Sequence, residues 1–149
     1  MPDIQLILGD CLQVVPTMPA QSVDAIITDV PYGTTACHWD SIIPFADLWR
    51  IVKHVLKPRG VFVTTASQPF TSALVMSNPG WFKFEIIWSK SRPSGYVHAK
   101  NKPLKSHENV LIFSDGRFPV VIAYVSLFST VVGRVYPEDW GIERLKVVG

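Results

Sequence analysis

Five short apolar runs restrict this chain to a fold built around a β-sheet. Each run has the length of a strand, and several are apolar throughout instead of alternating with polar residues. Continuous apolarity is typical of strands that are buried on both faces. The runs are Ile4 to Leu8, Val23 to Thr28, Gly60 to Ala66, Phe84 to Trp88 and Asn109 to Phe113.

Two helical patterns lie between these runs. The first has one apolar stripe followed by stop signals, and the second begins near Gln68-Pro69 and ends at Asn78-Pro79-Gly80. A strand, a helix and a second strand imply a parallel crossover, so we expect an α/β sheet of doubly wound type. The first stripe consists of Phe45, Leu48, Val52 and Val55 or Leu56, and its stop signals are Lys57, Pro58 and Gly60.

The size and composition indicate one globular unit. A length of 149 residues is typical of one domain, and 48% hydrophobic residues are enough for one core. The early run Ile4 to Leu8 is too short for a signal peptide or a membrane span, so we expect a cytoplasmic protein. Cys11 and Cys37 have neither CxxC nor CxxxH spacing, so we expect no metal site and no disulfide.

The charges are distributed unevenly along the chain. Six aspartates and no Lys or Arg precede Arg50, whereas the segment from Ser89 to His107 is basic and has no acid. Pro93, Gly95 and Pro103 lie within that segment, and the pattern predicts a basic loop. Such a loop is either solvated or binds phosphates of a nucleic acid. Its basic residues are Lys90, Arg92, Lys100, Lys102 and Lys105.

The tetrapeptide Asp29-Val30-Pro31-Tyr32 directly follows the second apolar run, at the end of a strand where α/β sheets bind ligands. A nucleobase amino group is a poor nucleophile, and the Asp29 carboxylate and the Val30 carbonyl could accept hydrogen bonds from its two N–H groups. Pro31 would stiffen the turn and Tyr32 would stack on a base flipped out of the duplex. The alternative is that Asp29 is an ordinary turn residue and Tyr32 a packed surface aromatic.

These residues resemble motif IV, (Asp/Asn/Ser)-Pro-Pro-(Tyr/Phe/Trp), of the adenine-N6 and cytosine-N4 DNA methyltransferases. The resemblance covers roughly residues 4 to 114, in the β-type motif order that places the catalytic half before the cofactor half. Further similar segments are Leu6-Ile7-Leu8-Gly9-Asp10-Cys11-Leu12, Ser22-Val23-Asp24-Ala25-Ile26-Ile27-Thr28, Lys57-Pro58-Arg59-Gly60, Ser67-Gln68-Pro69-Phe70, Trp88-Ser89-Lys90 and Pro103-Leu104-Lys105-Ser106-His107-Glu108-Asn109.

The resemblance implies a Rossmann-like methyltransferase sheet, S-adenosylmethionine as cofactor and double-stranded DNA as substrate. It implies catalytic roles for Asp29, Val30, Pro31 and Tyr32, and it implies cofactor contacts from Asp10, Cys11 and Asp29. Because Asp opens the tetrapeptide, it favours adenine N6 over cytosine N4 as the target. The basic residues of the 89–107 segment would then contact DNA, in the restriction-modification setting typical of prokaryotes and phages.

The sequence departs from the family pattern in two places. Val30 replaces the first Pro of motif IV, and the expected Phe-x-Gly-x-Gly loop is missing, since the nine glycines include no Gly-x-Gly pair. We therefore expect a single methyltransferase-like domain over residues 1–149, truncated after a catalytic half at 1–116, with an unassigned tail at 117–149. Either a second copy of the chain or a complementing chain could supply what is missing.

Other readings remain open for several residues. Asp10 could be the N-cap of a helix starting near Leu12 as well as a cofactor contact. The group Cys37, His38, Trp39 and Asp40 matches no ligand template, and we expect it to pack a loop. As a whole, the chain could be a catalytically inactive relative that binds nucleic acid or a partner.

Overall fold

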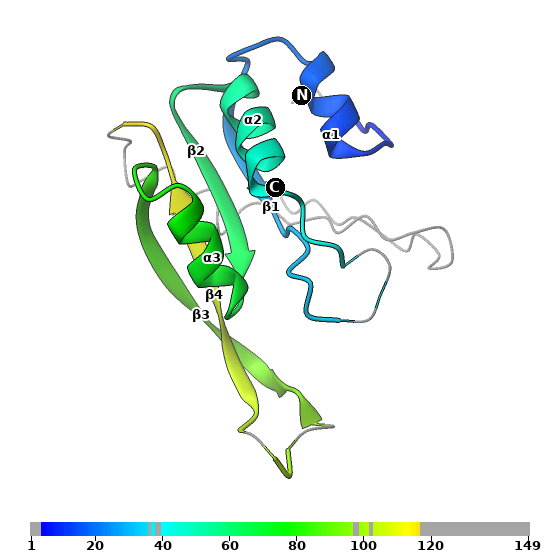
Figure 1. Cartoon of the computed structure of the whole chain (residues 1–149), viewed down its shortest axis with the longest axis vertical. Helices are drawn as coiled ribbons and strands as arrows, with labels where there is room; N and C mark the ends of the chain where they lie inside the picture. The colour runs from blue at the N-terminus through cyan, green and yellow to red at the C-terminus, as the bar shows by residue number, and fades with distance from the viewer. Residues whose placement is uncertain (1–3, 36, 38–39, 97–98, 102, 117–149) are drawn as a thin grey trace.

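Four strands form a mixed sheet in the order β1-β2-β4-β3 (Figure 1). The computed structural model describes residues 4–35, 37, 40–96, 99–101 and 103–116. β1 and β2 are parallel, whereas β4 is antiparallel to both β2 and β3. The strands are β1 (Val23–Thr28), β2 (Leu56–Ala66), β3 (Phe82–Ser94) and β4 (Lys105–Phe113).

In the described part of the chain, four helical segments accompany the sheet. α2 links β1 to β2 and α3 links β2 to β3, so the predicted parallel crossover after β1 is confirmed. Both predicted helices lie within a few residues of their expected positions. The segments are α1 (Cys11–Val14), the 3-10 helix η1 (Val15–Thr17), α2 (Phe45–Val55) and α3 (Phe70–Ser77).

The main core lies between the sheet and the helices α2 and α3, which cover the same face (Figure 1). Trp49 of α2 is central, because its ring packs edge-on against Phe62 of β2 at 5.6 Å and Phe113 of β4 at 5.0 Å. Its indole N–H also donates to the Ser77 hydroxyl at 2.8 Å, which joins α2 to the end of α3.

A second cluster lies on the opposite face of the sheet, and its members among the described residues all belong to strands. Its buried members Val61 and Val63 of β2 alternate with Phe62, which faces the main core. β2 and β4 are thus buried on both faces, as the continuous apolar runs predicted. Among the described residues, the helices α2 and α3 of this α/β sheet cover one of its two faces. The other buried members are Val110 and Ile112.

The predicted strand from Ile4 to Leu8 is wrong. The segment has no regular structure, and its side chains are exposed, with Leu6 81% and Leu8 90% accessible. A strand needs another strand to satisfy its backbone N–H and C=O groups, and among the described residues none pairs with this segment. Apolarity indicated the tendency to be buried but could not supply the partner.

The predicted basic loop is also corrected, because about half of it, residues 89–94 and 105–107, continues the strands β3 and β4. β3 and β4 pair from Phe82 to Ser94, well past the end of β2, and form a two-stranded arm that projects from the sheet (Figure 1). Backbone pairing tolerates the Ser and Lys side chains there because the arm is exposed. Pro93 sits where the register shifts between Ser89 and Ser94. The tail at 117–149 lies outside the described residues, and no helix in the described part could cross a bilayer.

Candidate active site

The turn after β1 brings a carboxylate together with two hydroxyl groups. Tyr32 donates its hydroxyl proton to Asp29 Oδ1 at 2.6 Å, and the Thr65 hydroxyl of β2 donates to the same oxygen. The parallel register pairs Thr28 of β1 with Thr64 of β2. The next residue on each strand, Asp29 after the end of β1 and Thr65 near the end of β2, therefore lie side by side. A carboxylate offers about four acceptor positions, so these two bonds orient Asp29 without exhausting its acceptor capacity.

Tyr32 is held at both its ring and its hydroxyl group. The ring stacks on Phe70 of α3, with 5.3 Å between centroids and 30° between planes. Burial raises the pKa of Tyr32 well above its usual range, and the hydrogen bond to Asp29 raises it further. Tyr32 therefore keeps its proton as a donor to Asp29. Since Phe70 covers part of the ring, the stacking of Tyr32 on a base stays a prediction.

Val30 is anchored in the main core, where its side chain is 6% exposed, and Pro31 beside it is half-buried. The family pattern has Pro at this position, which would limit the backbone through its ring. In this chain the packing of the Val30 side chain restrains the same turn. The four residues predicted to be catalytic, Asp29 to Tyr32, thus form one turn that is attached to β1, to the core and to Thr65.

Asp40 organises the loop that follows the tetrapeptide. Its Oδ1 accepts hydrogen bonds from the backbone N–H groups of Tyr32 and Gly33, both at 2.9 Å. Its Oδ2 accepts from the N–H groups of Thr34 and Thr35 at 2.8 and 2.6 Å, and from the Thr35 hydroxyl at 2.8 Å. One carboxylate therefore satisfies five donors and closes the loop against Tyr32. Sequence reasoning expected loop packing here but not this role for Asp40.

Of the group Cys37, His38, Trp39 and Asp40, the structure describes only Cys37 and Asp40. Cys11 and Cys37 are both exposed free thiols. His38 and Trp39 lie outside the described residues. In the part of the chain that the structure describes, no group of three or more His, Cys, Asp or Glu side chains could hold a metal ion.

Acidification is expected to loosen this loop. Burial acts to raise the pKa of Asp40, but the hydrogen bonds from Thr35, Gly33 and Thr34 outweigh it and hold the pKa below the ordinary 3.8. Because the folded-state pKa is depressed, the stabilisation is complete above the unfolded value and is lost as pH falls through the folded value. We therefore expect the melting temperature of Asp40→Asn to fall less than that of the wild type when the pH is lowered from 5. Thermal unfolding of both proteins measures this difference. An equal loss in both proteins would contradict this role.

A cavity of about 450 Å³ lies beside the tetrapeptide, between η1, β1 and α2. Cys11, Asp29, Val30 and Pro31 contribute to its lining, which is otherwise mainly aliphatic. Asp10 is the N-cap of α1, where its Oδ1 accepts from Leu12 N–H at 2.8 Å. Cys11 and Asp29, two of the residues predicted to contact the cofactor, therefore line one cavity. The third, Asp10, precedes Cys11 in the sequence and caps α1.

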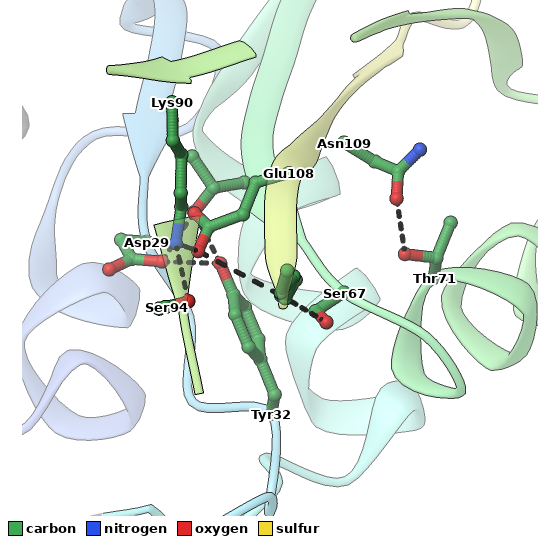
Figure 2. A network of polar contacts seen from close by, with 10 residues as sticks. Asp29, Tyr32, Ser67, Thr71, Lys90, Ser94, Glu108 and Asn109 are labelled. Atoms are coloured by element: carbon green, nitrogen blue, oxygen red, sulfur yellow. Dashed lines mark hydrogen bonds and ion pairs between the residues drawn. The ribbon is translucent and has the colours of Figure 1, made fainter. Parts of the chain in front are cut away.

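A second polar group lies next to Tyr32 (Figure 2). Lys90 of β3 and Glu108 of β4 form an ion pair, and the Lys105 ammonium lies 3.8 Å from the same Glu108 carboxylate and bonds the Ser67 hydroxyl. Burial lowers the pKa of Lys105, Glu108 opposes that effect, and Lys90 adds to it. The charge of Glu108 also reaches Tyr32, whose pKa it raises. Sequence reasoning missed Glu108 and Thr65; the only signal for Glu108 was its place in a family-like segment.

The five basic residues predicted to bind DNA are therefore not equivalent. Lys90 and Lys105 are half-buried and are paired with Glu108. Arg92 is exposed on β3 of the arm, Lys100 is exposed in the connection from β3 to β4, and Lys102 lies outside the described residues.

The described fold is similar to that of solved DNA methyltransferases. The PvuII DNA methyltransferase, which is cytosine-N4-specific, has a TM-score of 0.57 at 16% identity over 75% of this chain and 49% of that one. A Thermus thermophilus protein described as a DNA modification methylase has a TM-score of 0.53 at 22% identity, over 74% and 53%. M1.HpyAVI has a TM-score of 0.52 at 23% identity, over 70% and 53%.

These similarities establish the Rossmann-like α/β fold. The chain spans about half the length of the solved proteins, as their covered shares of 53%, 49% and 53% show. The Thermus thermophilus protein and M1.HpyAVI have also been solved with S-adenosylmethionine. No protein-family model matches the sequence, and no curated protein matches it closely.

Proposed function

We propose that this chain carries the catalytic half of a DNA amino-methyltransferase, over residues 1–116 of a single domain. Its substrate is a base flipped out of double-stranded DNA, with adenine N6 favoured over cytosine N4. The observation that carries the proposal is the Asp29 carboxylate at the end of β1, oriented by Tyr32 and Thr65 beside a cavity. S-adenosylmethionine, present in two of the similar structures, is the proposed cofactor.

The chemistry assigned to the tetrapeptide is positioning. Asp29 and the Val30 carbonyl accept the two amino N–H bonds, which turns the nitrogen lone pair toward the methyl donor. The cavity lined by Cys11 and Asp29 is the proposed site of the cofactor, which would supply an electrophilic methyl group on a sulfonium. With the cofactor bound, the nitrogen would form a bond to the methyl carbon as the sulfur–methyl bond breaks, and the excess proton would leave to solvent. Alignment of the two reactants accounts for most of the rate gain.

The direct test is incubation of the chain with S-adenosylmethionine and unmethylated genomic DNA, followed by mass spectrometry of the nucleosides. N6-methyldeoxyadenosine is the expected product, and N4-methyldeoxycytidine would correct the base. Calorimetric titration with the cofactor serves as the second measurement. If neither methylated nucleoside forms, and if the titration gives no heat at millimolar cofactor, the chain is not an enzyme that acts on its own.

A second candidate is a module that binds nucleic acid or a partner without catalysis. The absence of any Gly-x-Gly pair among the nine glycines favours it. A related proposal is that a second copy or a complementing chain completes the cofactor site. Light scattering with and without DNA separates a monomer from a dimer, and DNA binding without product in the methylation test identifies the binding module.

The β3–β4 arm and the connection between its strands are the proposed DNA contact, because both present exposed basic and aromatic side chains. Arg92 and Lys100 are exposed, and Trp88 and Tyr96 are 53% and 63% accessible. Two-stranded ribbons are narrow enough to enter the major groove of DNA. Lys102 belongs to the same predicted set, whereas Lys90 and Lys105 are assigned to the cluster around Glu108.

The double substitution Arg92→Ala/Lys100→Ala is expected to lower the affinity for DNA and to make that affinity less sensitive to the salt concentration. Each phosphate contact contributes about 0.9 to the slope of log affinity against log salt, so the slope should fall by about 1.8. Fluorescence anisotropy with labelled duplex DNA measures it. Lys57→Ala, which removes an exposed cation at the other end of β2, is the matched control and should leave the slope unchanged. An unchanged slope in the double variant would exclude the arm as a phosphate contact.

A further inference from the structure

One face of the sheet changes from apolar to polar toward the same end of β1, β2 and β4, and the change comes one same-face position later on β4, because Thr65 pairs with Val110. Side chains alternate along a strand, so Asp29 follows Ile27 of β1 and Thr65 follows Val63 of β2 on the face of the second cluster. Glu108 precedes Val110 of β4 on that face as well. The carboxylates of Asp29 and Glu108 therefore belong to one polar cluster above the second apolar cluster.

Lys90 provides a cation in this polar cluster. Figure 2 shows its side chain extending along the cluster so that its ammonium group points toward Asp29, Glu108 and the Tyr32 hydroxyl. The ammonium pairs with Glu108 and also donates to the Ser94 hydroxyl at 3.4 Å. The Lys90 and Glu108 side chains are only 21% and 18% exposed. When two charged groups become half-buried, the free energy of hydration that they lose can exceed the free energy of their attraction. A gain in stability is therefore a weak explanation for this ion pair.

The chemistry of the proposed substrate suggests another reason. In adenine and in cytosine, the carbon that bears the amino group is bonded to a ring nitrogen, N1 or N3, that accepts a hydrogen bond. A base whose amino group is bound by Asp29 presents this ring nitrogen beside the amino group, on the side open to a nearby donor. An ammonium group has three donors and no acceptor, which suits that nitrogen.

We propose that Lys90 is a specificity-determining residue that donates a hydrogen bond to the ring nitrogen next to the target amino group. Glu108 holds the ammonium in position for that bond. The corresponding ring nitrogens of guanine N1 and thymine N3 carry a hydrogen and would face the ammonium donor to donor. Lys90 thus selects adenine and cytosine together, and this assignment rests on the proposed function.

The test uses short duplexes with one unpaired adenine, or with 1-deazaadenine, which lacks the N1 acceptor, at the same position. An unpaired base costs less to flip, so the probe does not depend on a target sequence. Wild type should bind the adenine duplex about tenfold more tightly than the 1-deazaadenine duplex, the value of one charge-assisted hydrogen bond. Lys90→Met should bind both equally, and Lys90→Arg should keep part of the preference.

Two controls separate specificity from stability. Lys83→Met removes a half-buried lysine from the same strand and should keep the tenfold preference. Lys90→Met leaves Glu108 with the Lys105 ammonium at 3.8 Å, and thermal unfolding checks that the variant is folded. A preference that persists in folded Lys90→Met overturns the assignment, as does equal binding by wild type. If wild type does not prefer an unpaired adenine over a fully paired duplex, base flipping fails, and the proposed function falls with the assignment.

Discussion

Asp29→Ala is expected to lower the rate of methyl transfer by about 10²- to 10³-fold, the usual effect of removing one preorganised hydrogen-bonding group from a reacting centre. The Asp29 carboxylate is the acceptor that Tyr32 and Thr65 orient. Without it the amino nitrogen would have only the Val30 carbonyl to turn its lone pair toward the methyl donor. DNA binding through the arm should persist, because Arg92 and Lys100 are unchanged.

The measurement is the rate of product formation under single-turnover conditions, with binding measured separately. Asp24→Ala is the matched control, because Asp24 is another aspartate of the β1 region, and its side chain is 82% exposed and forms an ion pair with the surface residue Lys57. It should retain the wild-type rate. Methylation by Asp29→Ala at the wild-type rate would show that the tetrapeptide has been assigned the wrong role.

Asp40→Ala is expected to destabilise the fold by about 3 kcal/mol and to reduce methylation. Hydrogen bonds to a charged group contribute about 1.5–3 kcal/mol each, but most of the N–H groups released from Asp40 can turn to water. Tyr32 N–H is one of the donors, so the loss also frees the turn that positions the Tyr32 hydroxyl against Asp29.

Chemical unfolding measures the first effect, and the single-turnover rate measures the second. Asp47→Ala is the control for an aspartate in an exposed ion pair, here with Arg50, and should change stability by less than about 1 kcal/mol. If Asp40→Ala is as stable as Asp47→Ala, the five hydrogen bonds do not hold the loop.

The elements that sequence could predict are those whose signals are local. The helical stripe around Leu48 and Val52, the Pro at the start of α3 and the apolar runs of β2 and β4 each lie within a short stretch of chain. Their periodicity and stop signals hold in any surroundings. The tetrapeptide after β1 could be placed for the same reason, because the end of an apolar run marks the end of a strand.

Two predictions failed where the outcome depends on distant partners. Ile4 to Leu8 has the apolarity of a strand but is exposed, because pairing requires a second strand. The 89–94 segment reads as a loop, yet it is paired because β4 lies beside it. In both cases the backbone hydrogen bonds decided the structure, and these depend on which strand is adjacent.

The sequence by itself determined the kind of fold and the location of the tetrapeptide, since periodicity, turn residues and motif spacing are properties of neighbouring residues. Only the tertiary structure decided which side chains meet that tetrapeptide. Thr65 reaches Asp29 across the parallel pair, Asp40 closes the loop on Tyr32, and Glu108 joins Lys90 near the tyrosine hydroxyl. Strand order and register bring these residues together, and no local pattern encodes either one, because both follow from how the whole sheet buries its apolar faces.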